Sequence, residues 1–383
     1  MRGLHARPDG LGAVRFFMNN GIAIYPGLDN TPKENERLLE TAAKCGIRRV
    51  FTSLHIPETD KSRLQAEVRS LLARARQYGM EVISDVSPAT RDILGIDEND
   101  AAAFASLGIT RLRLDYGYTA EETARLSHRS DIRLQLNAST VTEEELQNLR
   151  DAGTDFSHLD ALHNFYPRRG TGLSTGFFRE KTALLHRYGI AVGAFIPSHR
   201  GRRRSPLADG LPTLEDHRDC PSDRSARALA ALDVNSVFLA DSLPTDDEIA
   251  ALGQLREHEL TLHATLLSRN PDVRKLLSHT FTTRADEARD AWRAQESRPL
   301  VKQFGIVIHP ENTDAPYLGA VTLDNKNYGR YMGELQIARY DLPADARTNV
   351  VAQIAATDLG LLEFLRPGEK FSFQFPKEPD IIE

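Results

Sequence analysis

The chain has 383 residues, a length that predicts one large domain and a smaller one. Its residues are 40% hydrophobic and 27% charged, which is typical of a folded globular protein and excludes general disorder. The net charge of -6 argues against a protein that coats nucleic acid or an anionic membrane, and no apolar run reaches the roughly 20 residues of a membrane helix. Two cysteines are too few for a disulfide scaffold or a four-cysteine zinc site, and they favour the reducing cytoplasm.

The N-terminal residues 1–20 contain arginines but no continuous apolar run of the length that a secretory signal needs, so we expect a disordered leader. The first regular element is a strand in "GIAIYPG". A helix follows at "TPKE", where Thr31 is the N-cap and Glu34 completes a capping box. The stretch "TEEELQNLRDAG" repeats this pattern with Thr142 and Glu145.

The central part of the chain repeats a helix, a glycine that ends it and an apolar strand, as in "KCGIRRVFTSL", "SLGITRLRLDYG" and "RYGIAVGAFIP". With the less regular repeats, this pattern predicts eight strands, near residues 21–27, 47–53, 80–85, 109–115, 131–137, 155–162, 190–196 and 234–240. Strands that alternate with helices indicate parallel crossover units, and eight of them favour a closed (β/α)8 barrel over residues 21–255. The main alternative is an open doubly wound sheet, although no G-x-G-x-x-G turn follows the first strand.

The pattern changes after the barrel. Residues 256–298 are rich in charge, so we expect a connecting segment there. Residues 299–383 contain short apolar runs, such as "LGAVTLDN", "GELQIARYDL" and "EKFSFQF", between Asn, Gly and Pro turns. They predict a small β-rich domain.

Chemistry in such barrels collects at the carboxyl ends of the strands, where the loops are free to vary. Two acidic residues, Asp85 in "VISDVSP" and Asp115 in "LRLDYGY", follow adjacent strands and are the predicted catalytic pair, because two carboxyl groups across one site suit glycosidic cleavage. The alternative is a structural role, as helix caps or as partners of Arg111, Arg113 or Arg133. Further acidic candidates are Glu58, Asp160, Glu215 and Asp241.

The same rule gives a set of predicted substrate-binding residues, all placed at or after a strand end: Tyr25, Ser53, His55, Asn137, His163, Asn164, Arg168, Glu215, Arg218 and Asp241. In the loop "LHNFYPRRGTGLS", the amides of Gly170 and Gly172 together with Arg168 and Arg169 predict an anion site. The alternative is a solvated loop that ends in a capping serine.

A second group of arginines lies in the long loop "SHRGRRRSPLADGLPTLEDHR" after the seventh strand. Loops in this part of a barrel are a usual place for phosphate, so Arg168, Arg202 and Arg218 are predicted to bind a phosphate or carboxylate group. The alternative for residues 202–204 is an exposed basic run that contacts only water.

Histidines at the strand ends, His55, His163 and His199, raise the alternative of a divalent metal site with Asp85 and Asp241. No H-E-x-x-H or C-x-x-C motif supports it. We therefore expect an enzyme without a metal ion or other cofactor.

Several longer stretches carry a resemblance to a known family: "GIAIYPG", "FTSLHIPE", "ISDVSP", "LRLDYG", "LNAST", "LHNFYPRRGTGLS", "GLPTLEDHR" and "LGAVTLDNKNYGRYMGELQI". Together they resemble the bacterial 6-phospho-N-acetylmuramidase family from about Gly21 to Phe375. The resemblance implies an α/β fold, with a TIM (β/α)8 barrel followed by a small cyclophilin-like β-barrel domain. It also implies cytoplasmic hydrolysis of the disaccharide of 6-phospho-N-acetylmuramic acid and N-acetylglucosamine during cell-wall recycling.

That substrate carries a phosphate and a carboxylate, in agreement with two arginine-bearing loops. In "DNKNYGRY" of the second domain, Arg330 is a further candidate for the anion if this domain covers the barrel; the other role we consider for this segment is a contact in a homodimer. Two functions compete with hydrolysis. One is a metal-dependent lyase or isomerase of sugar phosphates, and the other is a sugar-phosphate binding protein without activity, which would release its ligand uncleaved.

Overall fold

The computed structural model describes residues 6–8, 14–53, 61–86, 100–114 and 118–376. The chain divides into two compact units, Met1–Glu257 and His258–Glu383, which we describe separately. Among the described residues, no helix is both long enough and apolar enough to cross a lipid bilayer.

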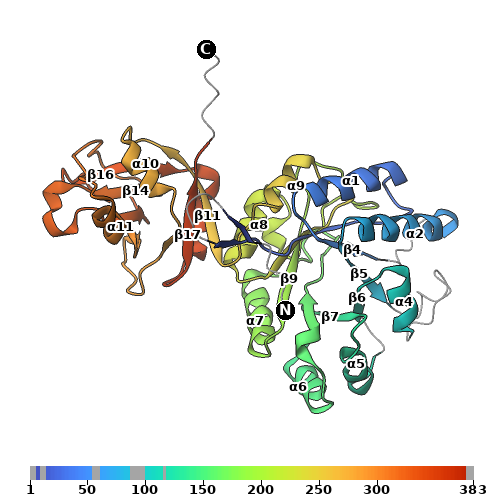
Figure 1. Ribbon diagram of the computed structural model, residues 1–383. Coiled ribbons are helices and arrows are strands. Elements are labelled where there is room, and N and C mark those ends of the chain that lie inside the picture. Colours follow the sequence, from blue (N-terminus) through green and yellow to red (C-terminus); the bar gives the residue numbers. More distant parts are fainter. Residues whose placement is uncertain (1–5, 9–13, 54–60, 87–99, 115–117, 377–383) are drawn as a thin grey trace. The chain divides into compact units, whose positions relative to one another are not determined.

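The first unit contains a closed barrel of parallel strands in the order β10-β3-β4-β5-β6-β7-β8-β9 (Figure 1). All eight predicted strands are present, so the barrel is confirmed over the open sheet. Their bounds are β3 Gly21–Ala23, β4 Arg49–Thr52, β5 Glu81–Val86, β6 Arg111–Leu114, β7 Arg133–Asn137, β8 Leu159–Leu162, β9 Ala191–Ile196 and β10 Ser236–Leu239.

Helices surround the strands on the outside of the barrel (Figure 1). Both predicted capping boxes are present, at Thr31 with Glu34 and at Thr142 with Glu145. The helices are α1 Pro32–Lys44, α2 Lys61–Gln77, α4 Ala101–Leu107, α5 Ala120–Ser127, α6 Glu143–Asp151, α7 Thr175–Arg187, α8 Ser222–Ala231 and α9 Asp246–Leu252, with short 3-10 turns η1 Phe156–His158 and η2 Glu215–His217.

The amino-terminal end of the barrel interior is closed by ion pairs. Arg49 contacts Glu81 and Asp160, each at 2.6 Å, and Arg111 contacts the same two carboxylates at 2.8 and 3.1 Å. Asp160, which the sequence offered as an acid or base, is therefore held in the floor of the barrel by two guanidinium groups. Above this floor lies an apolar layer that includes Phe51, Ile83, Leu162, Phe195 and Phe238, and the site must lie beyond it, at the carboxyl ends of the strands.

The expected disordered leader has structure in its described parts. Strands β1 Ala6–Pro8 and β2 Val14–Phe16 pair antiparallel. The side chain of Asn20 donates to the Leu252 carbonyl at 2.8 Å and accepts from the Val237 amide at 2.8 Å. This buried side chain joins the end of the predicted leader to the barrel.

The second unit is built on a seven-stranded sheet with the order β12-β17-β11-β16-β14-β15-β13. Its strands are β11 Glu259–Leu266, β12 Phe281–Thr282, β13 Ala291–Arg293, β14 Ala320–Asp324, β15 Leu335–Ala338, β16 Thr348–Ile354 and β17 Lys370–Gln374. The other elements are α10 Pro271–Leu277, α11 Ser297–Phe304, and the 3-10 segments η3 Lys326–Tyr331 and η4 Ala356–Phe364.

The structure corrects the expectation that residues 256–298 form a connecting segment. This segment is no connection, because β11, α10, β12 and β13 lie within it and β11 pairs with both β16 and β17 inside the sheet. Alternate residues of β11, Leu260, Leu262 and Ala264, are buried. This alternation with polar residues is the pattern of a strand with one buried face, which the expected connecting segment did not take into account.

Candidate active site

An aromatic pair and one arginine lie together at the carboxyl end of the barrel. Tyr25 follows β3, and its hydroxyl donates to the Ala240 carbonyl at 2.7 Å. Its ring meets the ring of Phe165 edge to face at 6.5 Å between centroids. The guanidinium carbon of Arg204 lies 5.0 Å from the Tyr25 ring centroid and 4.9 Å from that of Phe165, so the cation contacts both rings.

Asp85, at the end of β5, lies on the same side of the barrel and is buried. Its Oδ1 atom accepts from Nη1 of Arg113 at 2.9 Å. The other terminal nitrogen of Arg113 donates to Oδ1 of Asn164 at 2.5 Å. Three parts of the barrel rim, from β5, β6 and the segment after β8, are thus tied together, and one predicted catalytic residue and one predicted binding residue meet there.

The ring of Phe51 connects Arg113 with the aromatic pair: the guanidinium carbon of Arg113 lies 6.0 Å from the Phe51 ring centroid, and the Phe51 and Phe165 centroids are 6.1 Å apart. Burial raises the pKa of the Tyr25 hydroxyl above its ordinary value, Arg204 lowers it, and the negative charges of Asp241 and Asp85 raise it further. Both carboxyl groups therefore act on the hydroxyl of Tyr25. Because the hydroxyl stays protonated at neutral pH, it can donate its hydrogen bond to the Ala240 carbonyl.

Asp241 is fully buried behind the rim. Its two oxygens accept from the backbone amides of Ser198, at 2.8 Å, and Arg204, at 3.0 Å. Burial raises the pKa of its carboxyl group to about 6. Since both oxygens of Asp241 bind the loop after β9, this residue positions Arg204. A direct contact of Asp241 with substrate stays a prediction.

His163, a predicted substrate-binding residue, has no exposed surface. Its Nδ1 atom lies 3.2 Å from the Ser139 hydroxyl, and its Nε2 atom lies 3.2 Å from the Thr182 hydroxyl. The Ser139 hydroxyl oxygen in turn accepts a hydrogen bond from the backbone amide of Asn164 at 2.9 Å. His163 thus supports Asn164 through Ser139, and a buried ring with both nitrogens engaged leaves no face for a sugar.

The pKa of His163 is lowered to about 3, first by burial and then by the charges of Arg113 and Lys181. At a pH below about 6.5, the ordinary pKa of histidine, this residue binds a proton in the unfolded chain but not in the folded protein. The free energy of unfolding therefore falls by about 1.4 kcal/mol for each pH unit below that value. We expect the His163→Gln variant to lose less stability than the wild type between pH 6.5 and 4.5, as measured by urea unfolding. An equal pH slope in the two proteins would contradict the assignment.

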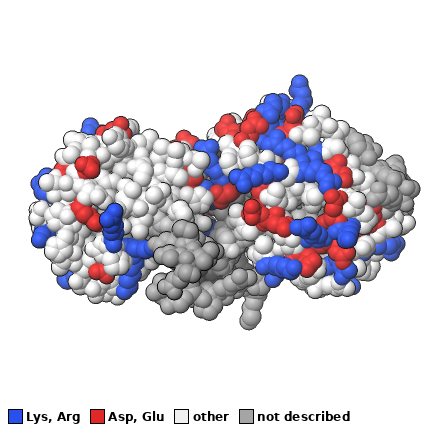
Figure 2. Space-filling model, turned by 90° about the horizontal axis from the view of Figure 1, so that it is seen from above, with Lys and Arg blue, Asp and Glu red and all other residues white. Residues whose placement is uncertain are grey.

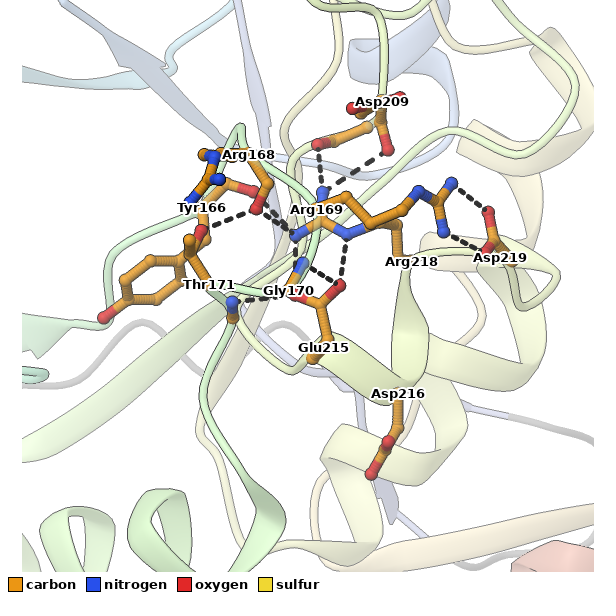
Figure 3. Close-up of polar contacts among 12 residues, drawn as sticks. Tyr166, Arg168, Arg169, Gly170, Thr171, Asp209, Glu215, Asp216, Arg218 and Asp219 are labelled. Atoms are coloured by element: carbon orange, nitrogen blue, oxygen red, sulfur yellow. Dashed lines mark hydrogen bonds and ion pairs between the residues drawn. The ribbon is translucent and has the colours of Figure 1, made fainter.

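The loop of Gly170 and Gly172 is already occupied by an anion from the chain itself. Glu215 accepts from the Gly170 amide at 2.8 Å and from the Gly172 amide at 2.7 Å (Figure 3). Its carboxylate also accepts from Nε and Nη2 of Arg218, each at 2.7 Å. These contacts lower the pKa of Glu215 to about 2, with the hydrogen bond from Arg218 as the largest cause.

Arg218 has its whole guanidinium group directed at protein atoms. It is 1% exposed, and it donates to the carbonyls of Tyr166, Arg168 and Gly210 at 3.0, 3.2 and 3.0 Å (Figure 3). Arg218 and Glu215 thus join the loop after β8 to the loop after β9, and their predicted contact with substrate stays a prediction.

The remaining predicted anion-binding arginines are Arg168, Arg202 and Arg330. The Arg202 side chain pairs with Glu34 and donates to the Asp29 carbonyl at 2.8 Å, where it lines an open cavity of about 540 Å³ beside α1 and α9. Basic and acidic side chains are intermixed over the right-hand part of the face in Figure 2. Arg168 is exposed, and Arg330 belongs to the second unit, so their contact with substrate stays a prediction.

Comparison with known families decides the relationship. The family described as "6-phospho-N-acetylmuramidase, N-terminal" matches residues 20–254, and the one described as "6-phospho-N-acetylmuramidase, C-terminal" matches residues 258–374. The chain belongs to the 6-phospho-N-acetylmuramidase family. This confirms the resemblance, and the family name denotes a glycoside hydrolase. A comparison with curated protein sequences finds no match.

Two solved structures show the same family architecture over both units. An uncharacterized protein from B. cereus is 29% identical, with a TM-score of 0.79, and the match covers 94% of this chain and all of that one. A conserved protein of unknown function from Enterococcus faecalis is 33% identical, with a TM-score of 0.65, and the match covers 94% of this chain and 96% of that one.

For this 6-phospho-N-acetylmuramidase family member, the described site lacks some predicted residues. Asp115, His55 and Glu58 lie outside the described residues, so their roles stay predictions. Ser53 is half-buried at the end of β4, and Oδ1 of buried Asn137 accepts from the Ser139 amide at 3.1 Å. Within the described ranges, no group of three or more His, Cys, Asp and Glu side chains is arranged to hold a metal ion.

Two arginines of this family member were not predicted as site residues. Arg113 was considered only as a structural partner of Asp85, although its position two residues after Arg111 in a strand puts both side chains on one face. Arg204 was grouped with Arg202 and Arg203 in one basic run. No spacing rule applies within a loop, so the sequence held no signal that separated Arg204 from its neighbours.

Proposed function

We propose that the protein hydrolyses the glycosidic bond between 6-phospho-N-acetylmuramic acid and N-acetylglucosamine, and that it does so in the cytoplasm during cell-wall recycling. Membership of the family supports the substrate. The observation that carries the proposal is the group of Asp85, Arg113, Tyr25 and Arg204 at one end of the barrel, because it combines a carboxylate, two cations and an aromatic surface suited to an anionic sugar.

In this mechanism Asp85 acts as a carboxylate, since it is ion-paired with Arg113. It supports the positive charge that develops at the anomeric carbon or attacks that carbon. The other predicted carboxyl group, Asp115, donates a proton to the glycosidic oxygen as N-acetylglucosamine leaves, and a water molecule completes the hydrolysis. Asn164, held by Arg113 and Ser139, is positioned to hydrogen-bond the sugar.

Arg204 is the residue that we propose for the phosphate or carboxylate of the substrate. Arg218 is saturated by the chain, Arg202 pairs with Glu34, and Arg203 donates to backbone carbonyls, including that of Ser198 at 3.0 Å. The Nε atom of Arg204, in contrast, is buried without a hydrogen-bond partner among the described residues. A buried donor of this kind is costly unless a ligand satisfies it.

We expect the Arg204→Ala variant to lose about 10- to 100-fold in kcat/KM for the phosphorylated disaccharide, the range for one charge-assisted hydrogen bond. The matched control is Arg202→Ala, which removes a neighbouring arginine that points elsewhere and should keep near-wild-type kcat/KM. Kinetics of both variants would test this, and equal losses in the two would contradict the assignment.

The direct test of the proposed function is to incubate the protein with the disaccharide in its phosphorylated and unphosphorylated forms and to measure released N-acetylglucosamine. We expect release from the phosphorylated form and much slower release from the other. Recovery of intact phosphorylated disaccharide after binding would support the binding protein without activity instead.

A further inference from the structure

The second unit contains a cavity of about 580 Å³ whose lining residues have no role in the mechanism proposed above. Its walls come from three segments of that unit: the residue Arg284 after β12, the start of α11 with the residues before it, and the turn from η3 to β15. This volume is in the range of ordinary small-molecule sites.

The lining of the cavity is strongly positive. Four cationic side chains, Arg284, Arg298, Lys302 and Arg330, line it together with one carboxylate, Glu334, and Arg284 is also paired with Asp286 outside the lining at 3.0 Å. Such an excess of one sign inside a concave surface raises the local concentration of ions of the opposite sign. The ligand that fits the charge is an anion.

Glu334 organises two of these cations. Its side chain is 7% exposed, and its oxygens lie 3.6 Å from Nη1 of Arg284 and 3.5 Å from Nη1 of Arg298. Nη2 of Arg298 donates to the Arg330 carbonyl at 2.7 Å and so joins α11 to η3. The two guanidinium groups are therefore held in place before a ligand arrives, which lowers the entropic cost of binding.

Lys302 differs from its neighbours because its ammonium group makes no ion pair or hydrogen bond with the part of the chain that the structure describes. The rest of the lining includes apolar groups of Ala294, Pro299, Val301 and Met332. A ligand with both a charged group and a less polar body would use both parts of this surface.

We propose that this cavity of the second unit is a ligand site for a small organic phosphate such as a sugar phosphate. Guanidinium groups match phosphate oxygens in geometry, and an unpaired ammonium adds a third positive contact to a dianion. The apolar wall takes the carbon face of the sugar.

The experiment is acetylation footprinting of the full chain, with Lys302 followed by mass spectrometry. We expect glucose 6-phosphate to protect Lys302 several-fold, glucose to give no protection, and inorganic phosphate to protect only at much higher concentration. The exposed Lys370, which is not part of the lining, is the internal control. Absence of protection by glucose 6-phosphate, or equal protection by inorganic phosphate, would overturn the proposal.

A pair of variants links the protection to the cavity. In Arg298→Gln the concentration of glucose 6-phosphate that half-protects Lys302 should rise at least about tenfold, because one charged contact is lost. Arg289→Gln removes an exposed arginine of the same unit outside the lining and should leave that concentration unchanged. Equal behaviour of the two variants would overturn the site. Neither readout requires hydrolysis, so failure here and failure of the proposed function are distinguishable.

Discussion

The Asp85→Asn variant should lose about 10²- to 10⁴-fold in kcat for the phosphorylated disaccharide, the range expected when a carboxyl group that takes part in the chemistry is neutralised. Asparagine keeps the shape of the side chain and can still accept from Arg113, but it carries no negative charge for the anomeric centre. Release of N-acetylglucosamine, measured with saturating substrate and corrected for the folded fraction, gives this value.

The matched control is Asp160→Asn. Both aspartates have side chains that are 12% exposed, and both are paired with buried arginines, Asp85 with Arg113 at 2.9 Å and Asp160 with Arg49 at 2.6 Å. Only Asp85 lies at the carboxyl end of the strands. Asp160→Asn should therefore lower the melting temperature while each folded molecule keeps its activity. A similar loss of kcat in the two variants would mean that Asp85 is only structural.

The Arg218→Met variant should have the largest effect on stability, a loss of about 3–5 kcal/mol in the free energy of unfolding of the barrel unit. Methionine fills a similar volume, but it leaves Glu215 as a charge without its cation and leaves the Tyr166, Arg168 and Gly210 carbonyls without a donor. Denaturant unfolding followed by circular dichroism measures the loss.

Arg169→Met is the control for this prediction. Arg169 lies in the same loop and also pairs with a carboxylate, Asp219 at 2.6 Å, but its side chain is 54% exposed. Exposed pairs contribute about 0–1 kcal/mol, so this variant should unfold close to the wild type. If both variants lost the same free energy of unfolding, the buried position of Arg218 would not explain the contribution of its ion pair.

The barrel could be predicted from the sequence because its evidence is local and repeated. A glycine that ends a helix, a capping box and a strand of apolar residues each depend on near neighbours in the chain, and the order of eight such units specifies parallel strands. Strand ends then indicate where the rim lies, which is why Tyr25, Asp85 and Asn164 were predicted to lie there. The second unit was less predictable, since β11 pairs with β17, about a hundred residues away in the chain.

The direction of each loop side chain could not be predicted. The three arginines at 202–204 are identical in type and adjacent in sequence, yet one pairs with Glu34, one donates to backbone carbonyls and one contacts Tyr25 and Phe165. An irregular backbone has no repeat that assigns faces, so the partners decide. For Arg204 a deciding partner is Asp241, which follows β10 and accepts a hydrogen bond from the backbone amide of Arg204.

The sequence by itself determined the family, the closed barrel and the edge at which polar groups gather, because periodic patterns and long matching stretches carry that information. Only the tertiary structure decided which charged side chains pair with one another inside the fold. The loop of Gly170 and Gly172 is the clearest case: its amides suit an anion, and the anion is the Glu215 carboxylate, brought there from the next loop by buried Arg218. Buried charges must find partners, and folding selects those partners by distance in space rather than along the chain.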